Sequence, residues 1–238
     1  MRQYAQSFYD ELHHGVDVRV LNLKSDEGRR ELDALLATAE VLLTSQREAA
    51  LERLGLAWTA VSSRYPRLCQ IAIVGSATGD DAGHDLTYLV AAGLATPPTM
   101  PATLLADLAG AERAVTATFA ALRLVEKSGR GHRIVVPLED AAKAFAGPHK
   151  HGLTCTGGLL AGDHPGYNFY AARDGWVALA ALEPHFAARV QTASGVAFTR
   201  DALKAYFSRH DIQHWRQWAA QHDIPLATLP SSSHSDRA

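Results

Sequence analysis

The chain has 238 residues, of which 47% are hydrophobic and 20% are charged, and its formal net charge at pH 7 is -2. These proportions are typical of a globular protein and exclude an intrinsically disordered one. Without a basic excess to neutralise phosphates, nucleic acid is not expected as a partner. Cys69 and Cys155 form no CxxC pair, which favours a reducing compartment and argues against a structural zinc site.

The ends and the apolar runs bear on where the protein works. The first residues lack the apolar core of a signal peptide, and the longest apolar runs, such as 177–182, are too short to cross a bilayer. We therefore expect a cytoplasmic protein without membrane contact. Twelve histidines, His149 and His151 among them, match no metal-ligand spacing, so no metal site is predicted.

Short apolar runs alternate with amphipathic segments along the first 147 residues. Strands are expected at 18–23, 41–44, 68–74 and 134–136. Helices are expected at 27–38, 46–54, 58–64, 103–127 and 138–145. Ser25 or Asp26 is expected to cap the first of these helices, and Gly55 to end the second. Strands connected through helices predict a parallel sheet, and so an α/β fold.

The pattern changes after Gly147. Residues 148–165 are rich in Gly, His and Thr and are predicted to be a linker. Residues 167–182 predict a β-hairpin that turns at Arg173-Asp174-Gly175, and helical patterns follow at 184–192, 200–208 and 212–222. The predicted organisation is a large α/β domain at 1–147, a linker at 148–165, a small α+β domain at 166–230 and a disordered tail at 231–238.

Common nucleotide and hydrolase motifs are absent, but a series of short segments is distinctive. No GxGxxG follows a strand, and the chain has neither a P-loop nor a GxSxG elbow. The distinctive segments are Leu23-Lys24-Ser25-Asp26-Glu27-Gly28, Glu52-Arg53-Leu54-Gly55-Leu56, Pro66-Arg67-Leu68, Gly83-His84-Asp85-Leu86-Thr87-Tyr88, Leu105-Ala106-Asp107-Leu108, Ser128-Gly129-Arg130-Gly131, Asp174-Gly175-Trp176-Val177-Ala178 and Ala181-Leu182-Glu183-Pro184-His185-Phe186. Their order and spacing resemble the CaiB/BaiF family, the class III CoA-transferases and α-methylacyl-CoA racemases, over about 21–229.

The resemblance implies a fold and a set of site residues. The fold would be a Rossmann-like parallel-sheet domain, shortened here, with a small α+β domain. Asp107 matches the aspartate shared by the family's transferases and racemases, and His84 matches the second base of the racemase branch. Glu183 matches a glutamate from the small domain, and Arg53 an arginine near coenzyme A. The substrate would be a coenzyme A thioester, with no tightly bound cofactor.

Two reactions fit these residues. Inverting the α-carbon of a 2-methylacyl-CoA needs two groups that remove a proton and return one, and an imidazole with a partly desolvated carboxylate suits this task. A CoA transferase instead uses one carboxylate as a nucleophile that carries the acyl group as an anhydride. Asp107 serves either reaction, whereas His84 favours racemisation or epimerisation, which is our first prediction.

Each of these residues also has a purely structural interpretation. Asp107 could cap the following long helix, and Asp85 the helix that runs from Leu86. His84 could be a turn residue satisfied by the backbone. Glu183 could be a charge at a helix start, and Arg53 a solvated cation at a helix end.

Departures from the family pattern lead to further expectations. The chain begins almost directly before the Leu-Lys-Ser segment and stops soon after Leu229, so we expect a member shortened at both ends. Ala109-Gly110-Ala111 stands where relatives carry glycines, which would narrow the space for a thioester. A sheet that lacks its edges needs cover, so the chain is expected to form a homodimer, interlocked as in the family, or to join a second subunit. A non-catalytic acyl-CoA-binding protein or subunit is the alternative from another class.

Overall fold

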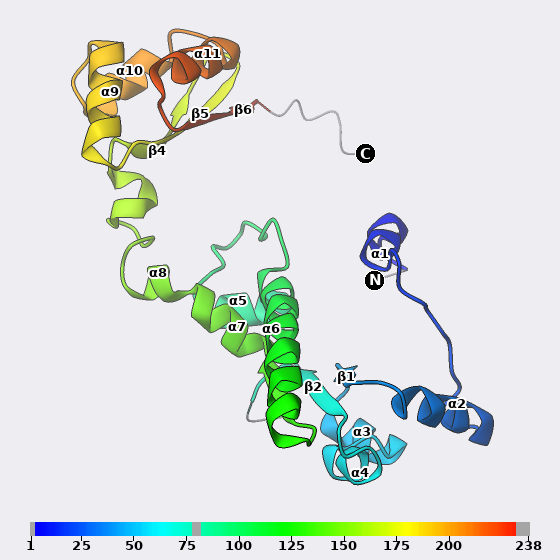
Figure 1. Ribbon diagram of the computed structural model, residues 1–238. Helices are drawn as coiled ribbons and strands as arrows, with labels where there is room; N and C mark the ends of the chain where they lie inside the picture. Colours follow the sequence, from blue (N-terminus) through cyan, green and yellow to red (C-terminus); the bar gives the residue numbers. More distant parts are fainter. Residues whose placement is uncertain (1–2, 78–81, 232–238) are drawn as a thin grey trace. The chain divides into compact units, whose positions relative to one another are not determined.

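The computed structural model describes residues 3–77 and 82–231, and the chain forms two compact units, Met1–Ala144 and Phe145–Ala238 (Figure 1). The first contains a three-stranded parallel sheet and the second a separate three-stranded antiparallel sheet. The predicted α/β class is confirmed. No helix in the described ranges combines the length and the apolar character that a membrane span needs.

The first unit is built on strands in the order β1-β2-β3. These strands are β1 (Val41–Thr44), β2 (Cys69–Val74) and β3 (Arg133–Pro137). The helices of this unit and of its junction with the second are α1 (Gln6–Leu12), α2 (Asp26–Leu36), α3 (Glu48–Leu54), α4 (Trp58–Arg64), α5 (Asp85–Ala91), α6 (Leu105–Ser128) and α7 (Leu138–Phe145). Strands β1 to β3 and helices α2 to α4, α6 and α7 lie within two residues of their predicted bounds. The hydroxyl of Ser25 caps α2 by accepting from the Gly28 N–H, and Gly55 ends α3 with a φ of 71°.

Helices cover both faces of the parallel sheet. The 24-residue helix α6 packs on the face that carries Cys69 and Ile71, in a cluster that also holds Val136. On the opposite face the buried Gln70 donates its amide to the Leu56 carbonyl at 2.9 Å, in the connection between α3 and α4. Successive side chains of β2 thus point to opposite faces of the sheet, and those on both faces are buried.

One predicted strand of the first unit is wrong. Residues 16–22 have no regular structure, and the side chain of Val20 is 95% exposed. Backbone N–H and C=O groups of a strand need a neighbouring strand, and the run lies outside the β1-β2-β3 sheet. Arg19, which lies between Val18 and Val20 in this run, forms ion pairs with Asp17 and Glu31.

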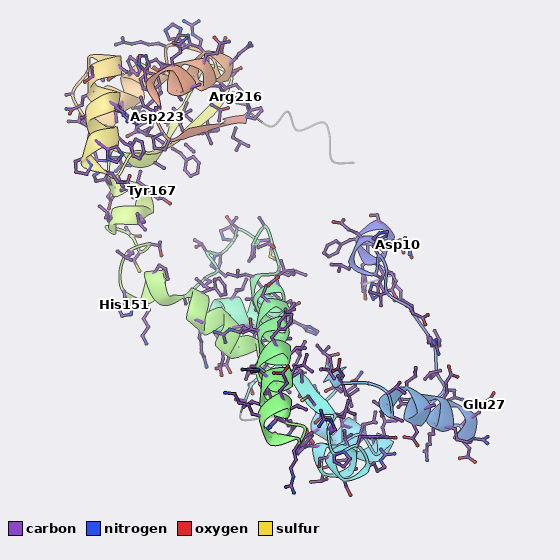
Figure 2. All side chains as sticks on the ribbon, viewed as in Figure 1. Asp10, Glu27, His151, Tyr167, Arg216 and Asp223 are labelled. Atoms are coloured by element: carbon purple, nitrogen blue, oxygen red, sulfur yellow. The ribbon has the colours of Figure 1, made fainter. Side chains whose placement is uncertain are left out.

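The second unit is an antiparallel sheet covered by three helices on one face. Its elements are α8 (Gly147–Lys150), a π-helical turn η1 (Leu159–Asp163), β4 (Tyr167–Ala171), β5 (Gly175–Ala180), α9 (Pro184–Ser194), α10 (Arg200–Phe207), α11 (Ile212–His222) and β6 (Leu226–Pro230). The hairpin β4–β5 turns where predicted, whereas β6 was not predicted. Tyr167 begins β4 next to η1, and Arg216 of α11 donates to the Thr228 hydroxyl of β6 at 2.5 Å (Figure 2).

The core of the second unit is aromatic. Trp215 is fully buried, and its ring centroid lies 4.9 Å from that of Phe207 and 5.0 Å from that of Tyr206. The indole N–H of Trp215 donates to the Phe207 carbonyl at 2.9 Å, so its polar atom is satisfied. The predicted linker range holds α8 and η1, and of the predicted tail only Ser231 is described.

Candidate active site

A cavity of about 450 Å³ opens at the carboxyl ends of the parallel strands. The segments that follow β1 and β2, residues 45–48 and 75–77, form part of its wall. The rest comes from the end of β2, from β3, from residues 82–84 with Tyr88 of α5, and from Leu138 at the start of α7. Open α/β sheets bind ligands at this edge because the loops that leave the strands converge there. Of the predicted site residues, His84 lines this cavity.

His84 is held by its main chain at the start of α5. Its N–H donates to the Thr87 hydroxyl at 3.0 Å, and that hydroxyl donates to the His84 carbonyl at 2.8 Å. A Cβ on the preceding Gly83 would collide with the ring of Tyr88, so the approach to His84 requires glycine. The expectation of a backbone-satisfied turn residue describes the main chain of His84 correctly, while its side chain is exposed.

Asp107 is the third residue of α6. The cap of this helix is provided by Asp85, and not by Asp107. The Oδ1 atom of Asp85 accepts the N–H of Ala106 at 2.7 Å and the N–H of Asp107 at 3.1 Å. Asp85 is therefore the cap of α6 rather than of α5, which begins at Asp85 itself after His84. Both structural interpretations, of Asp107 as a cap and of Asp85 as the cap of the nearer helix, are wrong. Asp107 is exposed.

Asp107 interacts with charged and polar neighbours at the starts of α5 and α6. Desolvation of its carboxyl raises the pKa of Asp107, the charge of Asp85 raises it further, and His84 lowers it. Burial raises the pKa of the Tyr88 phenol, and the charges of Asp107 and Glu139 add to that effect. The structure thus brings His84 and Asp107 within electrostatic reach of each other and adds Asp85 and Tyr88 to the predicted set.

Arg53 and Glu183 lie elsewhere. Arg53, exposed near the end of α3, lines a separate hollow of about 400 Å³ with Asp33 and Arg64. Glu183 belongs to the second unit, where it is the exposed N-cap residue of α9 and precedes Pro184. Both positions match their structural interpretations, and their predicted roles stay predictions.

Sequence reasoning also missed an ion pair at the cavity that His84 lines. Arg133 of β3 pairs with Glu48 at the start of α3, and both residues line the cavity. They are 85 positions apart, so no local pattern could have joined them. Tyr88, by contrast, stands four residues after His84 on one helix face, a spacing that could have identified it. No group of three or more metal-ligating side chains occurs in the described parts of the chain.

Comparison with known proteins gives consistent results. A family model described as CoA-transferase family III matches residues 1–234. A CaiB/baiF CoA-transferase family protein of Caenorhabditis elegans is 28% identical over 199 residues, covering 74% of this chain and 58% of the relative. The (R)-2-hydroxy-4-methylpentanoate CoA-transferase of Clostridioides difficile is 30% identical over 134 residues, covering 51% and 34%. The chain thus spans less than two thirds of the length of these curated relatives.

Solved structures share the fold. A CAIB/BAIF family protein from Brucella suis superimposes with a TM-score of 0.72 at 20% identity, over 89% of this chain and 65% of that one. A protein from Mycobacterium tuberculosis gives a TM-score of 0.70 at 18% identity, over 90% and 65%. At these identities the likeness concerns the fold alone.

Proposed function

Because this chain belongs to CoA-transferase family III, we propose that it acts on acyl-CoA thioesters and racemises or epimerises the α-carbon of a 2-methylacyl-CoA. The observation that carries this proposal is the hydrogen bond at 3.1 Å from the Asp107 N–H to Asp85, the residue after His84, because it brings the starts of α5 and α6 together. Inversion of the α-carbon requires two groups that transfer a proton, and a carboxylate with an imidazole suits that role.

The proposed reaction is a two-base proton transfer. One group removes the proton from the carbon next to the thioester, leaving an enolate, and the other returns a proton to that carbon. Asp107 is suited to this role because its side chain is exposed and its pKa is raised, which makes its carboxylate a stronger base. Asp85 supports the assignment, since it satisfies the helix start and leaves the Asp107 carboxyl available.

The other predicted parts of the site belong to the same proposal. The coenzyme A thioester is the substrate, with no tightly bound cofactor, and Arg53 is assigned to coenzyme A. Glu183 is assigned to the site as a residue of the second unit. A homodimer, or assembly with a second subunit, in the cytoplasm stays a prediction.

A CoA transfer between carboxylic acids is the second candidate. Relatives of this chain are named CoA-transferases, among them a formyl-CoA:oxalate CoA-transferase of Escherichia coli that is 28% identical over 136 residues, which cover 51% of this chain and 32% of that enzyme. In this reaction the Asp107 carboxylate attacks the thioester carbonyl, the carbon–sulfur bond breaks, and coenzyme A leaves as its thiolate. The acyl group then rests on Asp107 as a mixed anhydride.

Exchange of the α-proton in D₂O tests the first proposal. Wild-type protein is expected to introduce deuterium at the α-carbon of 2-methylbutanoyl-CoA. Proton NMR measures this exchange as the loss of the α-proton signal. Asp107→Ala and His84→Ala should each lower the rate by about 10²- to 10⁴-fold, the contribution of a positioned acid or base. The matched controls are Asp26→Ala, an exposed first-turn aspartate of α2, and His151→Ala, an exposed histidine after α8. Both should retain the full rate.

Other outcomes identify the alternatives. Absent exchange, with labelled coenzyme A moving from an acyl-CoA to a free acid in a reaction that Asp107→Ala abolishes, would support the transferase. Calorimetry that detects binding of acyl-CoA without either reaction would support a non-catalytic binding protein. No binding of any CoA ester would contradict all three.

A further inference from the structure

We propose that the buried carboxylate of Asp85 is a positioning residue that holds the Asp107 backbone at the start of α6 and places a second negative charge beside the Asp107 carboxylate. The meaning of this role for catalysis rests on the proposed function, but the coupling between the two carboxylates is a property of the fold. Asp85 is 5% exposed and is the one buried Asp, Glu, His, Lys or Arg side chain in the described ranges. A buried charge is costly unless hydrogen bonds satisfy it.

The side chain of Asp85 anchors the first turn of α6 by hydrogen bonds. Leu104, the residue before the helix, provides no side-chain cap. The backbone N–H groups of the first turn have no acceptor within the helix and need another one. Asp85 Oδ1 accepts two of these N–H groups, those of Ala106 and Asp107. The backbone of Asp107 is thus bonded directly to Asp85, which fixes where its side chain leaves the helix.

The charge of Asp85 reverses the usual effect of a helix start. The N-terminus of a helix carries partial positive charge, which favours ionised carboxylates in its first turn and makes them weak bases. Asp85 places a second negative charge beside the same N–H groups, and like charges disfavour each other's ionisation. Desolvation contributes most to the raised pKa of Asp107, and the charge of Asp85 raises that pKa further, in agreement with this balance.

Within the described ranges, further titratable groups that act on Asp107 or on its neighbour Tyr88 lie at α5 and α7. On α5, His84 lowers the pKa of Asp107, and Tyr88 interacts with Asp107 through its phenol. On α7, Glu139 acts on Tyr88, and Lys143 pairs with Glu139 at 2.6 Å. Among these acidic and basic groups, Asp85 is the one with a carboxylate bonded to the Asp107 backbone.

Neutral replacement of Asp85 tests the proposal. Asp85→Asn and Asp85→Ser remove the charge but keep an oxygen that can cap a helix. In protein labelled with ¹³C at aspartate side chains, the pKa of Asp107 is expected to fall in either variant. The acid limb of the α-exchange pH profile should move to lower pH with it. A purely structural cap would lower stability without moving either quantity.

The matched control is Asp211→Asn. Asp211 caps α11 in the second unit by accepting the His214 N–H at 2.8 Å, so this variant loses a capping charge far from Asp107 in sequence and should leave the Asp107 titration unchanged. An unchanged or raised pKa of Asp107 in a folded Asp85 variant would overturn the proposal. So would unfolding of both Asp85 variants while Asp211→Asn folds, since Asp85 would then be only a cap. The NMR titration needs no turnover, so an inactive wild type would reject the proposed function and leave this coupling measurable.

Discussion

The two units bury their apolar side chains in different ways. In the second unit one cluster joins the sheet to its three helices and includes Trp215, Phe207 and Tyr170. The first unit divides its buried residues among three clusters, and the smallest, around Tyr88 and Ala106, lies where the candidate site residues emerge. The single aromatic core makes the second unit one continuously packed body. The separate clusters of the first unit leave positions between them where charged side chains can lie. The site thus depends on the less continuous of the two cores.

The largest expected effect is in the aromatic core. Trp215→Ala removes a fully buried indole that contacts Phe207 and Tyr206, and it should lower the free energy of unfolding by about 3–5 kcal/mol. Hydrogen exchange read by mass spectrometry should show the loss of protection in β4 to β6 and in α10 and α11. Trp176→Ala is the control, since this tryptophan is 46% exposed and should cost far less. Equal costs for the two variants would contradict a single buried core.

A smaller effect is expected in the divided core. Leu51 of α3 is 1% exposed and belongs to the cluster with Leu36, Leu56 and Val61, so Leu51→Ala should cost about 2–4 kcal/mol. Because α6 packs in a different cluster, exchange protection should fall in α2 to α4 and persist in α6. Loss of protection throughout the first unit would show that its clusters unfold as one. Leu35→Ala, at a side chain that is 38% exposed, is the control.

The smallest effect has the opposite sign. A carboxyl whose pKa is raised in the folded state binds its proton more tightly there than in the unfolded chain, so folding is less favourable once it ionises. Asp107→Asn removes this ionisation and should stabilise the fold above the raised pKa, with no gain below the unfolded value. The gain should stay under about 1 kcal/mol because Asp107 is exposed to solvent screening. Urea unfolding at several pH values measures it, and destabilisation at neutral pH would contradict the raised pKa.

Much of the fold was predictable because the decisive signals are local. The strand Val41–Thr44 and the helix Trp58–Arg64 lie at their predicted bounds, since apolar runs and glycine or proline stops act within a few residues. Residues 18–23 were predicted wrongly because a strand depends on neighbours that the run itself does not encode. Strand β6 was missed because Pro225 and Pro230 frame a short segment of weak strand character. Its pairing with β5 decides its conformation.

The candidate site divides in the same way. Asp107 and His84 became candidates because each lies in a short segment that resembles the family, and Asp85 links the two helix starts that carry them. The role of Asp85 could not be predicted from the sequence, because Asp85 caps α6 and not α5, the helix that begins at Asp85 itself. Arg133 and Glu48 meet through the pairing of β3 with β2, a long-range contact. Local motifs therefore supplied the candidate acid and base, and tertiary contacts determine what surrounds them.

The capping of α6 by Asp85 also has a consequence for the order of folding. The acceptor of the helix start lies 21 residues before the first N–H that it receives, so the chain must close a loop of that length before the first turn is satisfied. The backbone hydrogen bonds within the rest of this 24-residue helix join residues close in sequence and can form sooner. A chain caught early in folding would already hold α6 but would not yet place Asp107. The proposed site is thus a late product of folding, and a measurement of helix content alone would report its presence too soon.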